Sequence, residues 1–568
     1  MVPLGIVLSV TLVFLAVTCV EVALIGPIAR RLTLPPSLDF ITAVAALALF
    51  GFALFWVYLL DPRAGTVALA ALWTVILTLT AQRVRASAHL PLSADFVQPL
   101  VLTLSSACLG LGMLLLFRTP EAAAQIAAHR FTMQPLPADN VIPQIFAERL
   151  LDGQSPKALI GDWLSSDRPP LATGWMLLFQ QPLQLAGVSR ANAFFVGAFT
   201  FQMTWVAGVW AVLRACRFGR SASTIAIVFT AFTSVTLINS VFTWPKLSAG
   251  AFTLAAWAVL LGSRRIGRAG AVLCAVFLTL AMLSHGAAAL AVVATVFVLA
   301  VEWLRRRDRC QMWIAAWGVG AGTALYAPWF AYQRWYEPPG DRLVKWHLAG
   351  VIPIDGRSST HTLVDAYRQL SVREWLDLRW SNTNVLFREM FNVDRFIAPS
   401  VDVRTKEFFF LFAGIGLAGF CYLALPILPV AIARSNATMK AWVDCRRFSW
   451  LTLATLGFTI LLLFGPSGTI IHQIPYVIPL SLAALPIAFI SSVAHRVGAL
   501  LLVLQCIWFL GTWISPSPGW GGPLSYAGVF VLVAALCASA AAVAVTWGET
   551  SQCDGASGRA LGKQDAIV

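Results

Sequence analysis

The residues best suited to chemistry lie between positions 137 and 175, a polar stretch in a very apolar chain. Its carboxylates include Asp139, Glu148, Asp162 and Asp167. A segment this polar cannot lie in hydrocarbon, so it lies on a membrane surface or lines a wet cavity. Asp139 and Asp167 could divide the work of a transfer to a hydroxyl group, one as general base and the other as a ligand for the acceptor or a divalent cation. A structural reading is also open, with Asp139 as a helix cap and Asp167 as a turn residue.

Other polar residues stand beside this stretch or at the ends of expected helices. In the element 167–170, Arg168 precedes Pro169-Pro170, which keeps the backbone before it extended and starts the next helix. Lys246, His285 and His472 each stand where two expected spans meet, and polar groups at such corners commonly face a water-filled cavity. The alternatives are snorkelling of Lys246 to the interface and packing roles for the two histidines.

Composition assigns the chain to the membrane proteins. Of its 568 residues 58% are hydrophobic and 12% charged, with a mean hydropathy of +0.77, whereas soluble domains carry roughly 25% charged residues. The net charge of +14 comes from basic residues in short loops between apolar runs, which orient membrane helices, so we expect no nucleic-acid partner. The ten cysteines show no Cys-x-x-Cys spacing, so we expect neither disulfides nor a thiolate metal site.

The hydropathy pattern predicts an all-α polytopic integral membrane protein with about 13–15 transmembrane helices of about 20 residues each. The apolar runs lie at 3–26, 39–60, 66–82, 97–117, 191–213, 221–240, 246–262, 269–284, 286–303, 312–333, 406–433, 449–465, 475–494, 497–514 and 523–546. The predicted organisation is N-terminal helices in 1–96, a central module in 97–334, a polar loop in 335–405, C-terminal helices in 406–547 and a disordered cytoplasmic tail in 548–568.

Clusters of basic residues occur in every second loop between the predicted spans. The positive-inside bias places those loops in the cytoplasm. Arg305–Arg309 and Arg446-Arg447 are examples. The first polar segment (118–190) and the second polar segment (334–405) are then extracytoplasmic loops of a multi-pass plasma (inner) membrane protein. We expect short interfacial helices in both, at 141–151, at 171–185, where the helix is half-buried and does not span, and at 370–378.

These residues resemble the GT-C membrane glycosyltransferases. Asp139 just after an early span, then a surface helix, then Asp167-Arg168-Pro169-Pro170-Leu171 is similar to the protein O-mannosyltransferases, with their Asp-x-His-Pro-Pro-Leu element, and to the lipid A aminoarabinose transferases. Leu283–Gly286, Leu-Ser-His-Gly, stands in place of a family Leu-Thr-Lys-Gly, and 471–476 resembles the late Arg-Tyr-x-x-Pro segment. The chain departs from the family at Asn140, where a glutamate is usual, and at Arg168, His285 and His472, which replace other basic residues.

The resemblance implies a GT-C-like catalytic module, an extracytoplasmic active site and an inverting transfer. The donor would be a polyprenyl-phosphate sugar, and the acceptor a hydroxyl of a glycan, lipid or protein. Asp139 would be the general base, and Asp167 would hold the acceptor or, with Asp139, a divalent metal cation. Arg168 and Lys246 would offset the donor phosphate, with His285 and His472 as further ligands of the phosphate or sugar. Two other classes stay open, a transporter or flippase of lipid-linked sugars and a non-catalytic envelope-assembly protein.

Overall fold

The computed structural model describes residues 2–32, 34–87, 92–119, 121–132, 136, 138–262, 267–307, 309–354, 356–390, 401–422, 436–466, 474–516 and 521–564. Within these ranges every regular element is a helix and none is a β-strand. The predicted all-α class is therefore confirmed. Residues of the expected span at 406–433 that follow Tyr422, and His472, lie outside the described residues.

The lengths and hydropathy of the helices define a multi-pass membrane protein. Among the described residues, eight helical stretches are long and apolar enough to cross a membrane, or nine if one bent pair is a single span. The eight are Leu4–Ala29, Pro36–Leu60, Pro62–Ala86, Ala94–Leu114, Arg190–Ala215, Ala288–Arg305, His495–Trp513 and Tyr526–Trp547. Three shorter apolar helices, Lys246–Gly262, Arg268–Ser284 and Val477–Val493, occupy other ranges in which the sequence predicts spans.

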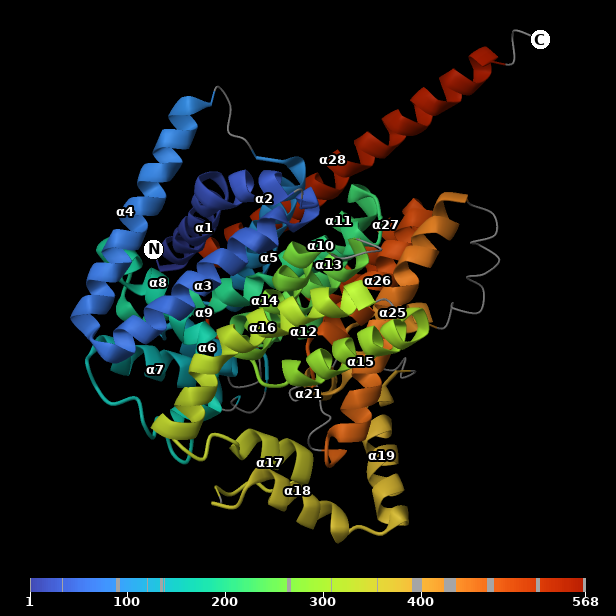
Figure 1. Ribbon diagram of the computed structural model, residues 1–568. Helices are drawn as coiled ribbons and strands as arrows, with labels where there is room; N and C mark the ends of the chain where they lie inside the picture. The colour runs from blue at the N-terminus through green and yellow to red at the C-terminus, as the bar shows by residue number, and fades with distance from the viewer. Residues whose placement is uncertain are drawn as a thin grey trace.

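The individual helices follow in chain order (Figure 1). Before the first polar segment lie α1 (Val2–Val20), η1 (Glu21–Ile25), α2 (Gly26–Leu32), η2 (Pro36–Leu38), α3 (Asp39–Leu60), α4 (Pro62–Ala86) and α5 (Ala94–Leu114). The first polar segment forms α6 (Ala123–His129), η3 (Ala138–Val141), α7 (Ile142–Leu151), η4 (Ser165–Asp167) and α8 (Leu171–Leu185).

The other described helices follow in chain order. The central helices are α9 (Arg190–Met203), α10 (Trp205–Ala215), α11 (Arg220–Ala231), α12 (Ser234–Val241), α13 (Lys246–Gly262), α14 (Arg268–Ser284), α15 (Ala288–Arg306), α16 (Arg309–Ala331) and η5 (Tyr332–Tyr336). The second polar segment forms α17 (Arg342–Ala349), α18 (Ser359–Arg368) and α19 (Val372–Phe387). The last helices are α21 (Val401–Phe409), α22 (Leu411–Gly414), α23 (Ala418–Cys421), α25 (Asn436–Leu462), α26 (Val477–Val493), α27 (His495–Trp513) and α28 (Tyr526–Gln564).

Two expectations about helices need correction. The sequence predicts that α8 is half-buried at the membrane interface, but 11 of its 15 residues are buried because it packs between α3 and α9. Gly174 of α8 meets Gly51 of α3 so closely that a Cβ atom on Gly174 would lie 2.4 Å from the Gly51 carbonyl oxygen, a small-residue contact typical of packed membrane helices. The predicted disordered tail continues α28 as far as Gln564, in a stretch without proline.

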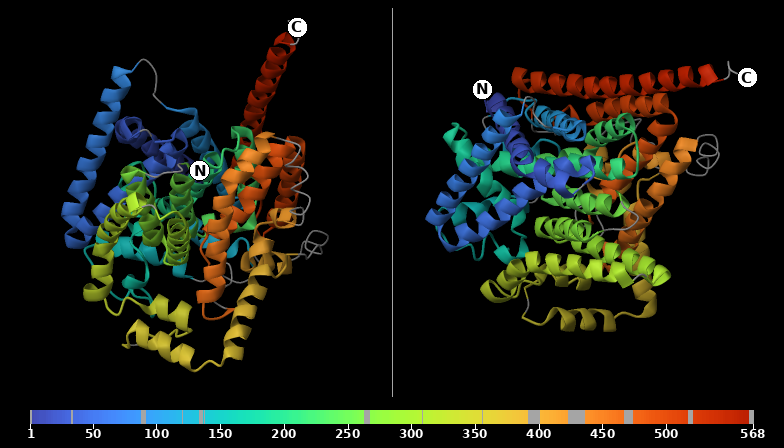
Figure 2. Two further views of the ribbon diagram at one scale, coloured as in Figure 1. Left: turned by 45° about the vertical axis from the view of Figure 1, so that its right-hand side comes forward. Right: turned by 45° about the horizontal axis from the view of Figure 1, so that its top comes forward.

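The second polar segment lies outside the bundle of apolar helices. In Figure 1, α17 and α18 stand below the bundle, and the far end of α28 projects from the opposite side. The views in Figure 2 show the same separation after rotation about either axis. Helices α17 and α18 of the second polar segment therefore stand at one end of the bundle (Figure 1), where Arg342 of α17 binds Asp162 of the first polar segment.

Candidate functional site

A cavity of about 630 Å³ opens between the two polar segments and the adjoining ends of the apolar helices. Its polar and aromatic lining comes from η3, the residues on either side of η4, the start of α13, the corner between α14 and α15, α17 and the end of α21. Among the lining residues are Asp139, Trp163, Arg168, Trp244, Lys246, His285, Trp346 and His347. The structure thus brings together four of the site residues predicted from the sequence, Asp139, Arg168, Lys246 and His285.

Asp139 points at a guanidinium and does not cap a helix. It lies in the 3₁₀ turn η3, and the N-cap of α7 is Val141, which makes no side-chain capping bond. Its Oδ2 atom accepts a hydrogen bond from Arg168 Nη2 at 2.7 Å, and its Oδ1 atom accepts one from Trp244 Nε1 at 2.9 Å. The Asn140 side chain anchors the turn by donating to the Phe242 carbonyl at 2.9 Å. The simple capping role considered for Asp139 is therefore wrong.

The Pro-Pro element sets the position of Arg168. Arg168 has extended backbone angles (φ −120°, ψ 110°) at the end of η4, as expected for a residue before proline, and α8 begins two residues after Pro169. The guanidinium lies over the Trp163 ring, 4.2 Å from its centroid, while it binds Asp139. Its side chain is only 10% exposed. Stacking and an ion pair together hold this cation at the cavity wall.

Lys246 is a buried cation held by aromatic rings. Its Nζ atom lies 3.9 Å from the centroid of the Trp244 ring and 5.6 Å from that of Tyr476. No carboxylate among the described residues lies within ion-pairing distance of Nζ. Because the residue is 5% exposed, Lys246 does not snorkel to the surface. An unneutralised ammonium on the wall of a cavity favours an anionic ligand.

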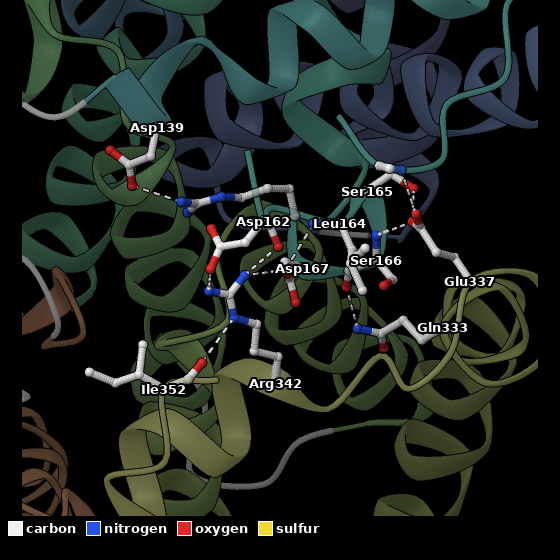
Figure 3. A network of polar contacts seen from close by, with 12 residues as sticks. Asp139, Asp162, Leu164, Ser165, Ser166, Asp167, Gln333, Glu337, Arg342 and Ile352 are labelled. Atoms are coloured by element: carbon white, nitrogen blue, oxygen red, sulfur yellow. Dashed lines mark hydrogen bonds and ion pairs between the residues drawn. The ribbon is translucent and has the colours of Figure 1, made fainter. Parts of the chain in front are cut away.

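Asp167 does not line the cavity but belongs to a network of polar contacts around Arg342 (Figure 3). Its carboxylate accepts a hydrogen bond from the Leu164 amide at 3.1 Å and lies 3.6 Å from Arg342 Nη1. Burial raises the pKa of Asp167, although the Leu164 hydrogen bond and the Arg342 and Arg168 charges oppose that rise. These contacts hold the turn that precedes Arg168. They do not bring the two predicted carboxylates together.

Arg342 of α17 connects the two polar segments. It donates to the Asp162 carbonyl at 2.6 Å, to the Asp162 carboxylate and to the Ile352 carbonyl at 3.2 Å (Figure 3). Its guanidinium also lies 5.0 Å from the centroid of the Trp163 ring. Only 3% of the Arg342 side chain is exposed. The start of α17 is therefore fixed on the loop that carries Trp163 and Arg168.

Glu337 makes a second connection that the sequence analysis did not find. Its buried carboxylate accepts hydrogen bonds from the Ser165 hydroxyl, from the Ser166 amide at 2.9 Å and from the Ala158 amide at 2.8 Å. Gln333 adds a bond from its side-chain amide to the Ser166 carbonyl at 2.9 Å. The hydrogen-bond partners of Glu337 are distant in the sequence, and a carboxylate in a loop gives no local sign of them. The sequence alone therefore could not identify this connection.

Two histidines face the cavity from different elements. His285, at the α14–α15 corner, accepts a hydrogen bond at Nδ1 from the Ala287 amide at 3.2 Å. Burial, with the charges of Lys246 and Arg168, holds its pKa well below the usual value. His347 of α17, which the sequence analysis did not select, stacks on Trp346 with ring centroids 5.4 Å apart. Burial, with the charges of Arg168 and Lys246, lowers the pKa of His347 to about 4.

The His, Cys, Asp and Glu side chains of the described residues do not form a metal centre. No group of three or more His, Cys, Asp or Glu side chains there is arranged to hold a metal ion. Asp139 and Asp167, the two carboxylates considered for a divalent cation, contact different arginines and do not share a site. His472 lies outside the described residues.

Comparisons with known proteins give distant similarity only. No protein-family model and no curated protein sequence matches the chain. It is similar to two solved structures of ArnT from Cupriavidus metallidurans, one in the apo state and one bound to undecaprenyl phosphate. Each is 13% identical with a TM-score of 0.30, and the alignments cover 60% of this chain and 75% and 76% of those chains. Such a score is too low to define a function, so the helices and the cavity define the class: a multi-pass membrane protein with a cationic, aromatic-lined site.

Proposed function

We propose that this protein is a GT-C-type glycosyltransferase that moves a sugar from a polyprenyl-phosphate donor to a hydroxyl acceptor at the extracytoplasmic face of the plasma membrane. One observation carries the proposal. A single cavity at one end of the apolar helices combines a carboxylate, Asp139, with two cations, Arg168 and Lys246, and with three tryptophan rings. The similarity of the sequence around Asp139 and Arg168 to GT-C motifs supports the same function.

The cavity has separate features for each part of such a donor. Arg168 and Lys246 present positive charge for the phosphate, and a guanidinium is well suited to binding phosphate oxygens. The rings of Trp163 and Trp346, whose centroids are 6.2 Å apart, line the cavity beside the Arg168 guanidinium and His347 and add apolar contact area for a sugar. Leucine and valine side chains of α17 continue the lining and provide an apolar wall for an isoprenoid chain: Leu343, Val344 and Leu348.

The chemical step assigned to Asp139 depends on Arg168. The carboxylate is paired with the guanidinium, and a donor phosphate would compete for that guanidinium. The freed carboxylate then accepts the proton of the acceptor hydroxyl. The acceptor oxygen forms a bond to the anomeric carbon from the face opposite the phosphate. The bond from that carbon to the phosphate oxygen breaks, and its electron pair leaves with the polyprenyl phosphate, whose charge Arg168 and Lys246 stabilise.

In this proposal Asp167 positions the loop and does not contact the acceptor. It fixes the turn that ends at Arg168, through Leu164 and Arg342. We assign no step to a divalent cation, because the two carboxylates considered for it are each engaged by an arginine in separate places. The acceptor hydroxyl group belongs to a glycan, a lipid or a protein.

Mass spectrometry of lipid-linked sugars and envelope glycans tests the proposal in cells with and without the protein. We expect the missing enzyme to leave accumulated polyprenyl-phosphate sugar and a glycan, lipid or protein that lacks one sugar. Wild-type protein should restore both pools, and Asp139→Asn should restore neither. Unchanged pools in cells without the protein would contradict the proposed function.

A transporter or flippase of lipid-linked sugars is the second candidate. One observation favours it, because α11 and α12 are bent by 65° at their break and would form a broken span, as in many transporters. A flippase would translocate the lipid-linked sugar without consuming it. Cells without the protein would then hold that lipid on the cytoplasmic face, and Asp139→Asn would not selectively block sugar transfer.

A further inference from the structure

We propose that His347 is a further ligand of the donor phosphate and takes up a proton when the phosphate binds. The inference rests on the proposed function, since it concerns the same cavity. It adds a residue of the second polar segment to a site otherwise formed by the first polar segment and the apolar helices. It also predicts that donor binding is coupled to pH.

The position of His347 supports a role in binding. The residue lies on α17 and lines the cavity with Asp139, Arg168, Lys246 and His285. Its Nδ1 atom is buried without a hydrogen-bond partner, and no described residue forms a hydrogen bond with either ring nitrogen. Stacking on Trp346 sets the plane of the ring, and Arg342 fixes the start of the same helix to Asp162. The imidazole is therefore held in place at the cavity with its hydrogen-bonding capacity unused.

The charges around His347 favour uptake of a proton when an anion enters. The groups that face it across the cavity are Arg168 and Lys246, both cationic, His285, and Asp139, whose charge the Arg168 ion pair already offsets. In the cavity without a phosphate, these cations and burial keep the ring neutral at neutral pH. A phosphate between the two cations reverses the local field and raises the pKa of the ring. The imidazolium then donates a charge-assisted hydrogen bond to a phosphate oxygen.

His285 has a different part in this arrangement. Its Nδ1 atom already accepts the Ala287 amide hydrogen, so the neutral ring carries its own hydrogen on Nε2 and can donate that hydrogen without a change of charge. Proton uptake is therefore assigned to His347, and His285 is assigned a constant donor role. This difference lets an experiment separate the two histidines.

Isothermal titration calorimetry of the full-length protein in nanodiscs, with farnesyl phosphate as the probe, tests the inference. Titrations near pH 6.5 in two buffers of different ionisation enthalpy give the number of protons taken up on binding. We expect wild-type protein to take up more protons than His347→Gln, and His347→Gln to bind about 10-fold more weakly, the effect at pH 6.5 of a bound-state pKa about one unit above that pH. The matched control is His361→Gln on α18, where the imidazole is 65% exposed and pairs with Asp365 outside the cavity. Protonation of the free probe is the same for all three proteins and cancels in the differences.

Equal proton uptake and equal affinity in wild-type protein and His347→Gln would overturn the inference. Inorganic phosphate is titrated in parallel. If it binds as tightly as farnesyl phosphate and His347→Gln weakens both, the role of His347 stands and the lipid-linked donor of the proposed function is wrong. If neither probe binds wild-type protein, both the proposed function and the inference are wrong.

If the His347→Gln variant fails to fold, a measurement on wild-type protein still tests the inference. The chain contains seven histidines, few enough for their ¹⁵N side-chain signals to be followed by NMR. We expect one histidine to titrate near pH 4 without ligand and above the pH of the calorimetry with farnesyl phosphate bound. If all seven pKa values are unchanged by bound farnesyl phosphate, His347 does not take up the proton.

Discussion

Lys246 lies over the ring of Trp244, with Nζ 3.9 Å from the ring centroid, while the indole nitrogen of the same tryptophan donates to Asp139. One side chain thus connects the buried cation of the site to its carboxylate. Because Trp244 and Lys246 are separated by Pro245 alone, a tight corner at the start of α13 sets this relationship. The corner places a positive and a negative group on one cavity wall without pairing them directly.

Lys246→Met should remove the charge of this cation and keep most of its apolar length. We expect farnesyl phosphate to bind about 10- to 100-fold more weakly, the loss that corresponds to one hydrogen bond to a charged group. Folding should be preserved, because burying an ammonium is itself costly. The control is Lys157→Met, whose Nζ atom lies over the Tyr336 ring outside the cavity. An unchanged affinity in Lys246→Met would remove Lys246 from the phosphate site.

Asp139→Asn should keep the size of the side chain but remove the proton acceptor. We expect turnover to fall by at least about 100-fold, as for loss of a general base, while the thermal unfolding temperature stays near that of the wild type. Binding of farnesyl phosphate should be undiminished, because Arg168 no longer has a carboxylate competing for it. The matched control is Asp152→Asn, which breaks an exposed ion pair with Arg190 and should change little. Full activity in Asp139→Asn would place the base elsewhere, with Asp162 or Asp167 to be tested next.

Glu337→Gln should weaken the attachment of the second polar segment to the first. The carboxylate accepts three hydrogen bonds, and an amide cannot accept all of them with the same geometry. We expect a loss of about 1–3 kcal/mol in the free energy of unfolding, measured by thermal or denaturant unfolding in detergent. Ser165→Ala tests the same contact from its other side, and the double variant should lose less than the sum of the two. Additive effects would show that Glu337 and Ser165 act independently.

The stability of the folded protein should depend on pH through His347. Its folded-state pKa of about 4 lies below the value of about 6.5 for an unfolded histidine. Between these values the unfolded chain binds the proton and the folded chain does not, so stability decreases as pH falls from about 6.5 to about 4. We expect unfolding temperatures of His347→Gln to decrease less over this range than those of wild-type protein. Parallel curves for the two proteins would contradict the buried, neutral state of the ring.

Cysteine labelling tests the predicted orientation in the membrane. Position 157 is exposed in the first polar segment, so Lys157→Cys should react with an impermeant maleimide in intact cells. Cys310, exposed at the start of α16 beside the basic cluster 305–309, should react only after permeabilisation. Cys310 thus serves as the internal control for the cytoplasmic face of the membrane. The reverse pattern would place the cavity in the cytoplasm and contradict the proposed extracytoplasmic enzyme.

The sequence by itself determined the membrane class and most helix positions. Apolar runs reveal spans because the hydrocarbon core requires a stretch of fixed length with internally satisfied backbone groups. The predicted runs at 39–60 and 246–262 coincide with α3 and α13. The sequence also identified Arg168, which directly precedes the Pro-Pro corner, and Asp139, a carboxylate earlier in the same polar segment, as candidates.

Only the tertiary structure decided which of these groups share a cavity. Asp167 is next to Arg168 in sequence, yet it contacts Arg342 and does not line the cavity, whereas Arg168 does. His347 and Glu337 come from the second polar segment, where no local pattern marks them. The physical reason is that hydropathy and turn signals depend on neighbours in the chain. The partner of a buried charge, in contrast, depends on how distant helices and loops pack, and in this protein Arg342 and Glu337 fix that packing.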